Sequence, residues 1–241
     1  RCAQVERSPV KRMIFAGQAG RMKRFEGEKA ARFARCFTVS DDDKKFLEEI
    51  TGKGVRVEVI PNGVDTDFFK LSAVGSQLSA EKSLVFTGSM DWLPNSDAVL
   101  FFCQEVLPLI WKRDPDVKFV VVGKGPTDAI KQLGEKDKRI IVTGRVDDVR
   151  PLMAKAAIFV VPIRVGGGTR LKILEAMSMQ KAVVSTTLGA EGIKYTDGKD
   201  IVIADEPNDF TEKVLQLFNN PQRCRQMGHA ARDLACGKYD W

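Results

Sequence analysis

From residue 83 onward, short apolar runs alternate with helical patterns. The runs are rich in Val and Ile, as in strands buried on both faces of a sheet. We expect strands at residues 84–87, 118–122, 140–143, 158–161, 182–185 and 201–203. Apolar residues spaced three and four apart predict helices at residues 95–111, 128–133, 149–156, 169–180, 208–219 and 222–236. This alternation predicts an α/β fold built on a doubly wound parallel sheet.

The residues before this region show a shorter version of the same pattern. Strands are expected at 36–39 and 55–60, on either side of a helix at 42–50 that Ser40 and Asp41 can cap. Asp41, Asp42 and Asp43 also match a DxD metal-binding pattern, but acidic residues in a first helical turn ordinarily complement the helix dipole. We therefore favour this interaction with the helix dipole over a metal site. Residues 73–82, which are poor in large apolar side chains, are expected to form an exposed connection.

The positive charge of the chain is concentrated at one end. The formal net charge is +6, and residues 1–40 hold ten Lys or Arg against three Glu, which leaves about −1 for the rest. Between Arg21 and Arg35 the bases interleave with Met22, Phe25 and Phe33 on an expected helix. Such a helix can lie on an anionic membrane surface. It can equally be a solvated helix that packs on another domain, which we favour. Nucleic acid is not expected as a partner, because no recognised motif accompanies the charge.

Several kinds of site are missing from the chain. The five cysteines show no CxxC spacing, which favours a reduced, cytoplasmic protein without structural zinc. His229 is the only histidine, so a Ser-His-Asp site or a histidine-based metal site is excluded within this chain. No GxxxxGK[ST] loop occurs, and no apolar run is long enough to span a membrane. These absences leave chemistry based on positioning and electrostatics, and no cofactor is expected.

The most informative stretch is residues 157–187, which reads as strand, glycine turn, helix, strand. Three glycines, Gly166, Gly167 and Gly168, precede the helix and let a backbone approach a ligand closely. Free N–H groups and the dipole at the start of a helix favour a phosphate or diphosphate. Three basic residues crowd the same place and can neutralise such an anion: Arg164, Arg170 and Lys172.

Glu175 lies further along the same helix, about 10 Å along the axis from Gly168. A carboxylate cannot bind a phosphate, but it can accept two hydrogen bonds from a vicinal diol such as ribose. Its neighbours Leu174 and Ala176 are expected to bury it, and a buried carboxylate needs partners. Phosphate at the glycine turn and sugar hydroxyls beyond it together indicate a nucleotide or a nucleotide sugar.

These residues resemble the donor-site signature of retaining GT-B glycosyltransferases, in particular family 4. The resemblance rests on the glycine turn, on LEAMSMQKAVVST at 174–186, on VIPNGVDTDFF at 59–69, and on the strand ends FTGSM, FVVVGKGP and IIVTGRVDDV. It implies a Rossmann-like domain that binds a nucleoside diphosphate sugar at residues 83–241. It also implies an interdomain linker at 59–82 and the truncated end of an acceptor-side domain at 1–58.

Two departures from the family pattern affect the expected site. The first of two glutamates that many members carry is replaced by Gly167, eight residues before Glu175. The Arg and Lys that members often carry after the first strand of this domain are also missing, because the chain has Gly88, Ser89, Met90, Asp91 and Trp92 there. We expect Arg164 or Arg170 to neutralise the diphosphate instead.

The resemblance and the pattern together give a set of expected donor-binding residues. They are Gly88, Gly144, Arg145, Arg164, Gly166, Gly167, Gly168, Thr169, Arg170, Leu171 and Glu175. The catalytic residues, the sugar, the base and the acceptor stay open. The resemblance implies a hexosyl-type transferase that acts, without a metal, on a polysaccharide or lipid-linked glycan precursor, at the inner face of the membrane. The alternatives are a nucleotide-binding module that is inactive as this truncated chain, and a sugar-nucleotide epimerase of the same fold.

Overall fold

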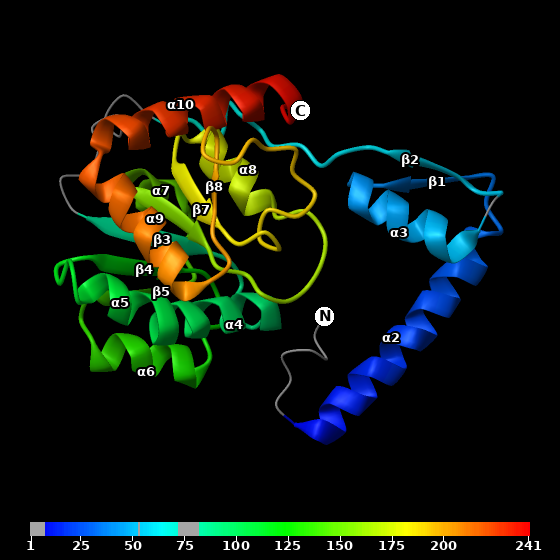
Figure 1. Ribbon diagram of the computed structural model, residues 1–241, viewed down its shortest axis with the longest axis horizontal. Helices are drawn as coiled ribbons and strands as arrows, with labels where there is room; N and C mark the ends of the chain where they lie inside the picture. The colour runs from blue at the N-terminus through cyan, green and yellow to red at the C-terminus, as the bar shows by residue number, and fades with distance from the viewer. Residues whose placement is uncertain (1–7, 53, 72–81) are drawn as a thin grey trace. The chain divides into compact units, whose positions relative to one another are not determined.

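The computed structural model describes residues 8–52, 54–71 and 82–241, and Figure 1 shows its course. The chain forms two compact units. The first contains the described residues up to Asn62, together with Val165–Thr169 and Glu191–Ile193. The second contains Gly63–Arg164, Arg170–Ala190 and Lys194–Trp241. Except for Lys82, the connection expected at 73–82 lies outside the described residues.

In its described residues, the first unit is built from two helices and two strands. Their order is α2 (Pro9–Ala30), β1 (Arg35–Thr38), α3 (Asp41–Thr51) and β2 (Arg56–Val59). The strands pair in parallel, which confirms the two strands predicted here with ends shifted by one residue. The Ser40 hydroxyl accepts the Asp43 backbone N–H at 3.0 Å, which confirms Ser40 as the cap of α3, whereas Asp41 is the first residue of the helix itself.

The predicted helix over residues 21–35 is wrong in its extent. Helix α2 already begins at Pro9 and ends at Ala30, because Pro is well suited to a first helical turn, and Arg35 opens β1. Along α2 the apolar and basic residues are not separated onto opposite faces, as they are in a helix that lies in a membrane surface. Membrane contact therefore stays a prediction. Within the described ranges, no helix combines the length and the apolar character needed to cross a bilayer.

The second unit is organised around a parallel sheet in the order β5-β4-β3-β6-β7-β8. Residues Leu84 and Val85 of β3 lie opposite Ile158 and Phe159 of β6, and the side chains of β3, β6 and β7 are buried throughout. This order is the one expected of a doubly wound sheet, so the predicted fold class is confirmed. The strands are β3 (Ser83–Thr87), β4 (Lys118–Val122), β5 (Ile140–Gly144), β6 (Ile158–Val161), β7 (Ala182–Ser185) and β8 (Val202–Ile203).

Helices cover both faces of this sheet (Figure 1). Helix α9 packs against α5 on one side, while α10 packs against α8. The predicted helices are all present, with ends that differ by a few residues. They are α4 (Leu93–Phe101), η2 (Phe102–Val106), α5 (Leu107–Trp111), α6 (Asp128–Lys136), α7 (Arg150–Lys155), α8 (Leu171–Ser178), α9 (Pro207–Asn219) and α10 (Pro221–Lys238).

The helix expected over residues 95–111 is interrupted in its middle. Its central turn, η2, is π-helical and lies between two α-helical pieces. Pro108 follows directly in α5 and lacks the N–H that a regular helix would bond to residue 104, so the turn before it widens. The irregularity therefore begins N-terminal to the proline that causes it.

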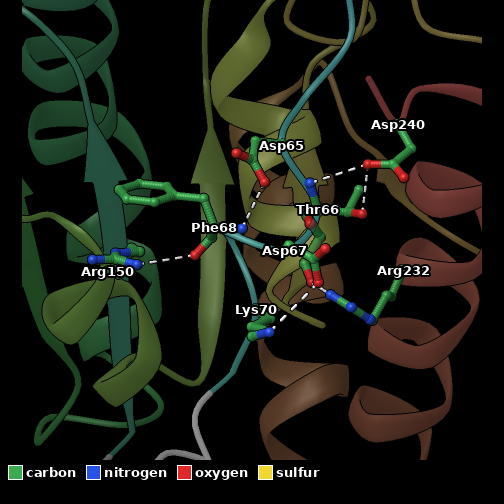
Figure 2. Close-up of polar contacts among 9 residues, drawn as sticks. Asp65, Thr66, Asp67, Phe68, Lys70, Arg150, Arg232 and Asp240 are labelled. Carbon is green, nitrogen blue, oxygen red and sulfur yellow. Dashed lines mark hydrogen bonds and ion pairs between the residues drawn. The ribbon is translucent and has the colours of Figure 1, made fainter.

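The beginning and the end of the second unit are bonded to each other (Figure 2). The Val64 N–H donates to the Tyr239 carbonyl at 2.7 Å, and the Thr66 hydroxyl donates to the Asp240 carboxylate at 2.6 Å. The bond from Thr66 and the nearby Arg232 guanidinium both lower the pKa of Asp240. Next to this contact, Arg150 stacks on the ring of Phe68 and donates to its carbonyl oxygen at 3.0 Å. Residues 63–68 are thus fixed to the second unit.

Candidate functional site

The candidate site lies where the sheet reverses its direction of winding. From β3 the chain moves to β4 on one side, and from β6 it moves to β7 on the other, while β3 and β6 are neighbours. The carboxyl ends of two such strands flank a crevice that commonly holds a ligand. Gly88 follows β3 at this point, and residues 162–164 follow β6.

Gly88, Asn95 and Lys172 meet at the end of β3. The Lys172 ammonium donates to the Asn95 side-chain oxygen at 2.8 Å, and the Asn95 side-chain nitrogen donates to the Ser89 carbonyl at 2.9 Å. A Cβ at Gly88 would stand 2.7 Å from the Lys172 Nζ and 2.8 Å from the Asn95 Nδ2. A side chain at this position would displace the Lys172 ammonium or the Asn95 amide, so glycine leaves room for both groups. We call these three residues the β3-end cluster.

Lys172 is an unusual cation because it is partly withdrawn from water. Its Nζ lies 4.1 Å from the centre of the Phe86 ring. Burial, together with repulsion from Arg170, lowers the pKa of Lys172 to about 7, although Glu175 acts in the opposite direction. An anion is attracted more strongly by an ammonium in this setting than by that of an exposed lysine, since water screens the charge less.

Glu175 lies one helical turn beyond Lys172 on α8 and faces the same way. It is partly buried between Leu174 and Ala176, which are fully buried. Burial raises the pKa of Glu175, and the Lys172 ammonium opposes that shift. A partly desolvated carboxylate is a strong acceptor for hydroxyl groups. One helix face therefore presents a cation and then, about 4.5 Å further along the axis, a hydrogen-bond acceptor.

Arg164 is already engaged with helix α4. Its guanidinium forms two hydrogen bonds to the Asp97 carboxylate, at 2.8 and 3.2 Å, and lies 4.1 Å from the centre of the Phe101 ring. These contacts fix the segment after β6 to α4. Donor binding by Arg164 stays a prediction, and its charge is shared with Asp97.

Gly144 and Arg145 lie at the end of β5, on the far side of β4 from the β3-end cluster. The Gly144 carbonyl accepts the Gly123 N–H at 3.1 Å, which links the ends of β4 and β5. Arg145 is exposed. The two residues are therefore at the same edge of the sheet as Gly88, two strands away.

The glycine turn joins β6 to α8. Gly166, Gly167, Gly168 and Thr169 fall within the segment that groups with the first unit. The helix predicted from 169 begins only at Leu171, since Arg170 is extended and occupies the N-cap position. It ends at Ser178 because Gln180 adopts a left-handed conformation, which stops a helix. Leu171 is 44% exposed, so it does not serve the core.

Two polar partners in this site were not anticipated from the sequence. Asn95 and Asp97 stand two residues apart in helix α4, and neither belongs to a motif. Asn95 is 8% exposed, and a buried amide at the start of a helix is the one signal that could have drawn attention to it. Among the described residues, no group of three or more His, Cys, Asp or Glu is placed to hold a metal ion.

Comparison with known proteins places the chain among glycosyltransferases. The family model described as glycosyl transferases group 1 matches residues 81–220. A phosphatidyl-myo-inositol mannosyltransferase of Mycobacterium tuberculosis is 30% identical over 213 residues, which cover 84% of this chain and 55% of that protein. An uncharacterised 44.6 kDa protein from the cps region of Klebsiella pneumoniae is 23% identical over 165 residues, covering 66% of this chain and 42% of its own length. The chain thus spans about half the length of these curated relatives.

Solved structures show the same fold. The Anabaena protein HepE, crystallised with UDP-glucose, superposes with a TM-score of 0.75 at 17% identity, over 90% of this chain and 63% of that one. The C-terminal domain of a glycosyl transferase group 1 family protein from Francisella tularensis gives 0.59 at 22% identity, over 74% of this chain and 99% of that domain. The second unit therefore has the Rossmann-like fold of GT-B glycosyltransferases, and the chain belongs to the glycosyl transferases group 1 family.

Proposed function

We propose that this chain is the donor-binding half of a retaining, metal-independent glycosyltransferase of family 4. The complete enzyme would move a hexosyl-type sugar from a nucleoside diphosphate sugar to a polysaccharide or lipid-linked glycan precursor. The observation that carries this proposal is the start of α8, which lies at the winding reversal of the sheet and is followed by the partly buried Glu175. A diphosphate at the helix start and a ribose at the carboxylate match this order.

For this transfer reaction the protein has mainly to position the two substrates and to stabilise the charge that develops. The bond between the anomeric carbon and the diphosphate oxygen breaks, its electron pair stays on that oxygen, and an acceptor hydroxyl bonds to the carbon as it loses its proton. The developing negative charge on the diphosphate needs cations and N–H donors fixed in advance. The start of α8 offers such donors, and the basic residues beside it supply charge.

The other residues expected from the sequence are proposed to bind the remaining parts of the donor. Glu175 would hold the ribose, while Gly88, Gly144 and Arg145 would shape the cleft around the rest of the nucleotide. The glycine turn would approach the diphosphate through its backbone. The residues proposed for that end of the donor are Arg164, Gly166, Gly167, Gly168, Thr169, Arg170 and Leu171.

The acceptor side is proposed to belong to the longer protein. The match covers only 42% and 55% of these relatives, so the 241 residues alone are expected to bind donor without transferring sugar. The first unit, up to residue 58, would then be the end of the acceptor-side domain, and residues 59–82 the linker. We place the complete enzyme in the cytoplasm, at the inner face of a membrane, on the strength of the lipid-linked acceptors that the family resemblance implies and of the net positive charge of residues 1–40.

Replacing Glu175 with alanine tests the ribose contact. We expect the free energy of nucleotide binding to weaken by about 1.5 to 3 kcal/mol, the range for hydrogen bonds to a charged group. The measurement is calorimetric titration of the 241-residue chain with UDP, GDP and ADP, with and without magnesium. Binding of one nucleotide that does not depend on magnesium, and that weakens in the variant, supports the proposal and names the base.

The matched control is Glu212→Ala, which removes an exposed carboxylate from α9 and leaves the candidate site intact. Its nucleotide affinity should equal that of the parent chain. Equal affinity in a folded Glu175→Ala variant would remove the ribose role, and no binding of any nucleotide by the folded parent chain would remove the proposed donor site itself.

A further inference from the structure

We propose that Lys172 is the cation that binds the leaving diphosphate in this chain, and that Asn95 is the residue that positions it. The inference rests on the proposed function and names the source of charge within that site. It is carried by the β3-end cluster, where the Lys172 ammonium is bonded to the Asn95 amide beside a glycine that leaves room for both groups.

The segment after β3 cannot supply this charge itself. From β3 to the end of α4, residues 83–101 contain no lysine or arginine, and the loop holds an aspartate, Asp91. Lys172 of helix α8, which follows β6, instead places a cation at the end of β3. The Lys172 Nζ reaches within 2.7 Å of where a Gly88 Cβ would stand, so the charge arrives directly at the end of β3.

Of the two arginines expected to neutralise the diphosphate, Arg164 is less available than Lys172. Arg164 donates twice to Asp97 and stacks on Phe101, so a carboxylate already balances its charge. Lys172 donates to a neutral amide, that of Asn95, which orients the ammonium without neutralising it. An anion that enters the crevice therefore gains more binding free energy from Lys172 than from Arg164.

Asn95 is suited to this positioning role because both ends of its amide are used. Its nitrogen is committed to the Ser89 carbonyl, which fixes the amide so that the oxygen points at Lys172. The side chain is buried, and helix α4 holds its backbone. An aspartate in the same place would have the same shape, but it would add a negative charge at 2.8 Å from the ammonium and repel a diphosphate.

The decisive experiment compares a diphosphate with its nucleoside on three proteins: the parent chain, Lys172→Met and Asn95→Asp. UDP and uridine are the probes, or the equivalent pair for whichever base binds, measured by calorimetry and by ligand-observed NMR. We expect Lys172→Met to weaken the affinity for UDP about 10- to 100-fold, the range for hydrogen bonds to a charged group. The affinity for uridine should stay unchanged. Asn95→Asp should weaken UDP in the same selective way.

The controls separate this inference from the proposed function. Glu175→Ala should weaken the affinities for uridine and UDP alike, because both ligands carry the ribose. Lys131→Met, which removes an exposed lysine from α6, should change neither. If Lys172→Met weakens both probes equally, or neither, Lys172 does not bind the diphosphate, even though the donor site stands. If the parent chain binds no nucleotide, the proposed function and the inference fall together.

The pH dependence of donor affinity gives a second, independent readout. The pKa of Lys172 is lowered to about 7, and the charged groups that act on it are Arg170 and Glu175, with neutral Asn95 and Phe86 as its other neighbours. Only the protonated ammonium attracts an anion, so affinity for a diphosphate should fall as the pH rises above about 7, approaching tenfold per pH unit. UDP-glucose is the suitable probe because its diphosphate does not titrate in this range. A fall in the parent chain that Lys172→Met lacks supports the inference, whereas a fall of the same size in both proteins would assign it to another group and overturn the inference.

Discussion

Replacing Gly123 with alanine is expected to destabilise the second unit by more than about 4 kcal/mol, a loss that few single substitutions cause. The new Cβ would stand 1.7 Å from the carbonyl oxygen of Gly88 and 2.7 Å from its carbonyl carbon. Both are backbone atoms, and Gly88 is bonded to β4 through its N–H and the Val122 carbonyl at 2.9 Å. The ends of β3 and β4 would have to separate. Urea unfolding followed by circular dichroism measures the change.

Gly144→Ala is the matched control for this substitution. Gly144 also ends a strand at the same edge and also has positive φ, but nothing lies within 4 Å of its missing Cβ. Its cost should be about 1 to 2 kcal/mol, which is the penalty for a left-handed backbone alone. Similar losses in the two variants would mean that the close approach of β3 and β4 is not what requires Gly123.

Phe102→Ala is expected to lower the free energy of unfolding by about 3 to 5 kcal/mol, the usual cost of emptying the place of a buried phenylalanine. The ring is fully buried, 4.8 Å from the centre of the Phe119 ring and 5.5 Å from that of Phe210. It therefore joins the π-helical turn η2 to both β4 and α9. The measurement is again urea unfolding, with Tm from a calorimetric scan as a check.

Phe37→Ala removes the same side chain where it is 58% exposed, in β1 of the first unit. We expect it to change stability by less than about 0.5 kcal/mol. A loss for Phe102→Ala that is no larger than this would show that the cluster of three rings does not hold α4 and η2 against the sheet. Because α4 also carries Asn95, a correctly packed Phe102 is a condition for the β3-end cluster.

The strands of the second unit were predictable because their signal is local. Strands β4, β6 and β7 have the predicted ends, since runs such as 158–161 are buried on both faces and contain almost only β-branched or aromatic residues. The ends of helices were less predictable. The π-helical turn depends on how Pro108 is accommodated, and α8 stops where Gln180 turns left-handed, for which its side chain gives no signal.

The contents of the candidate site were predictable only in part. The glycine turn and Glu175 lie within one continuous stretch, so a motif could point to them. The link from Lys172 to Asn95 joins residues 77 positions apart, and it exists because β3 and β6 are neighbours in the sheet. The same holds for Arg164 and Asp97, 67 positions apart. Composition and spacing carry no information on such pairs, because strand order decides which helices meet.

The bonds between residues 64–66 and 239–240 have a consequence for protein engineering. The two sequence ends of the second unit already lie within hydrogen-bond distance, which is the arrangement that tolerates circular permutation. A short glycine-serine bridge from Trp241 to Gly63 could therefore join them, and new termini could be opened in an exposed loop on the edge of the sheet opposite the β3-end cluster. A fragment trimmed to begin at residue 81, where the family match starts, would lack these hydrogen bonds and leave the Asp240 carboxylate without Thr66.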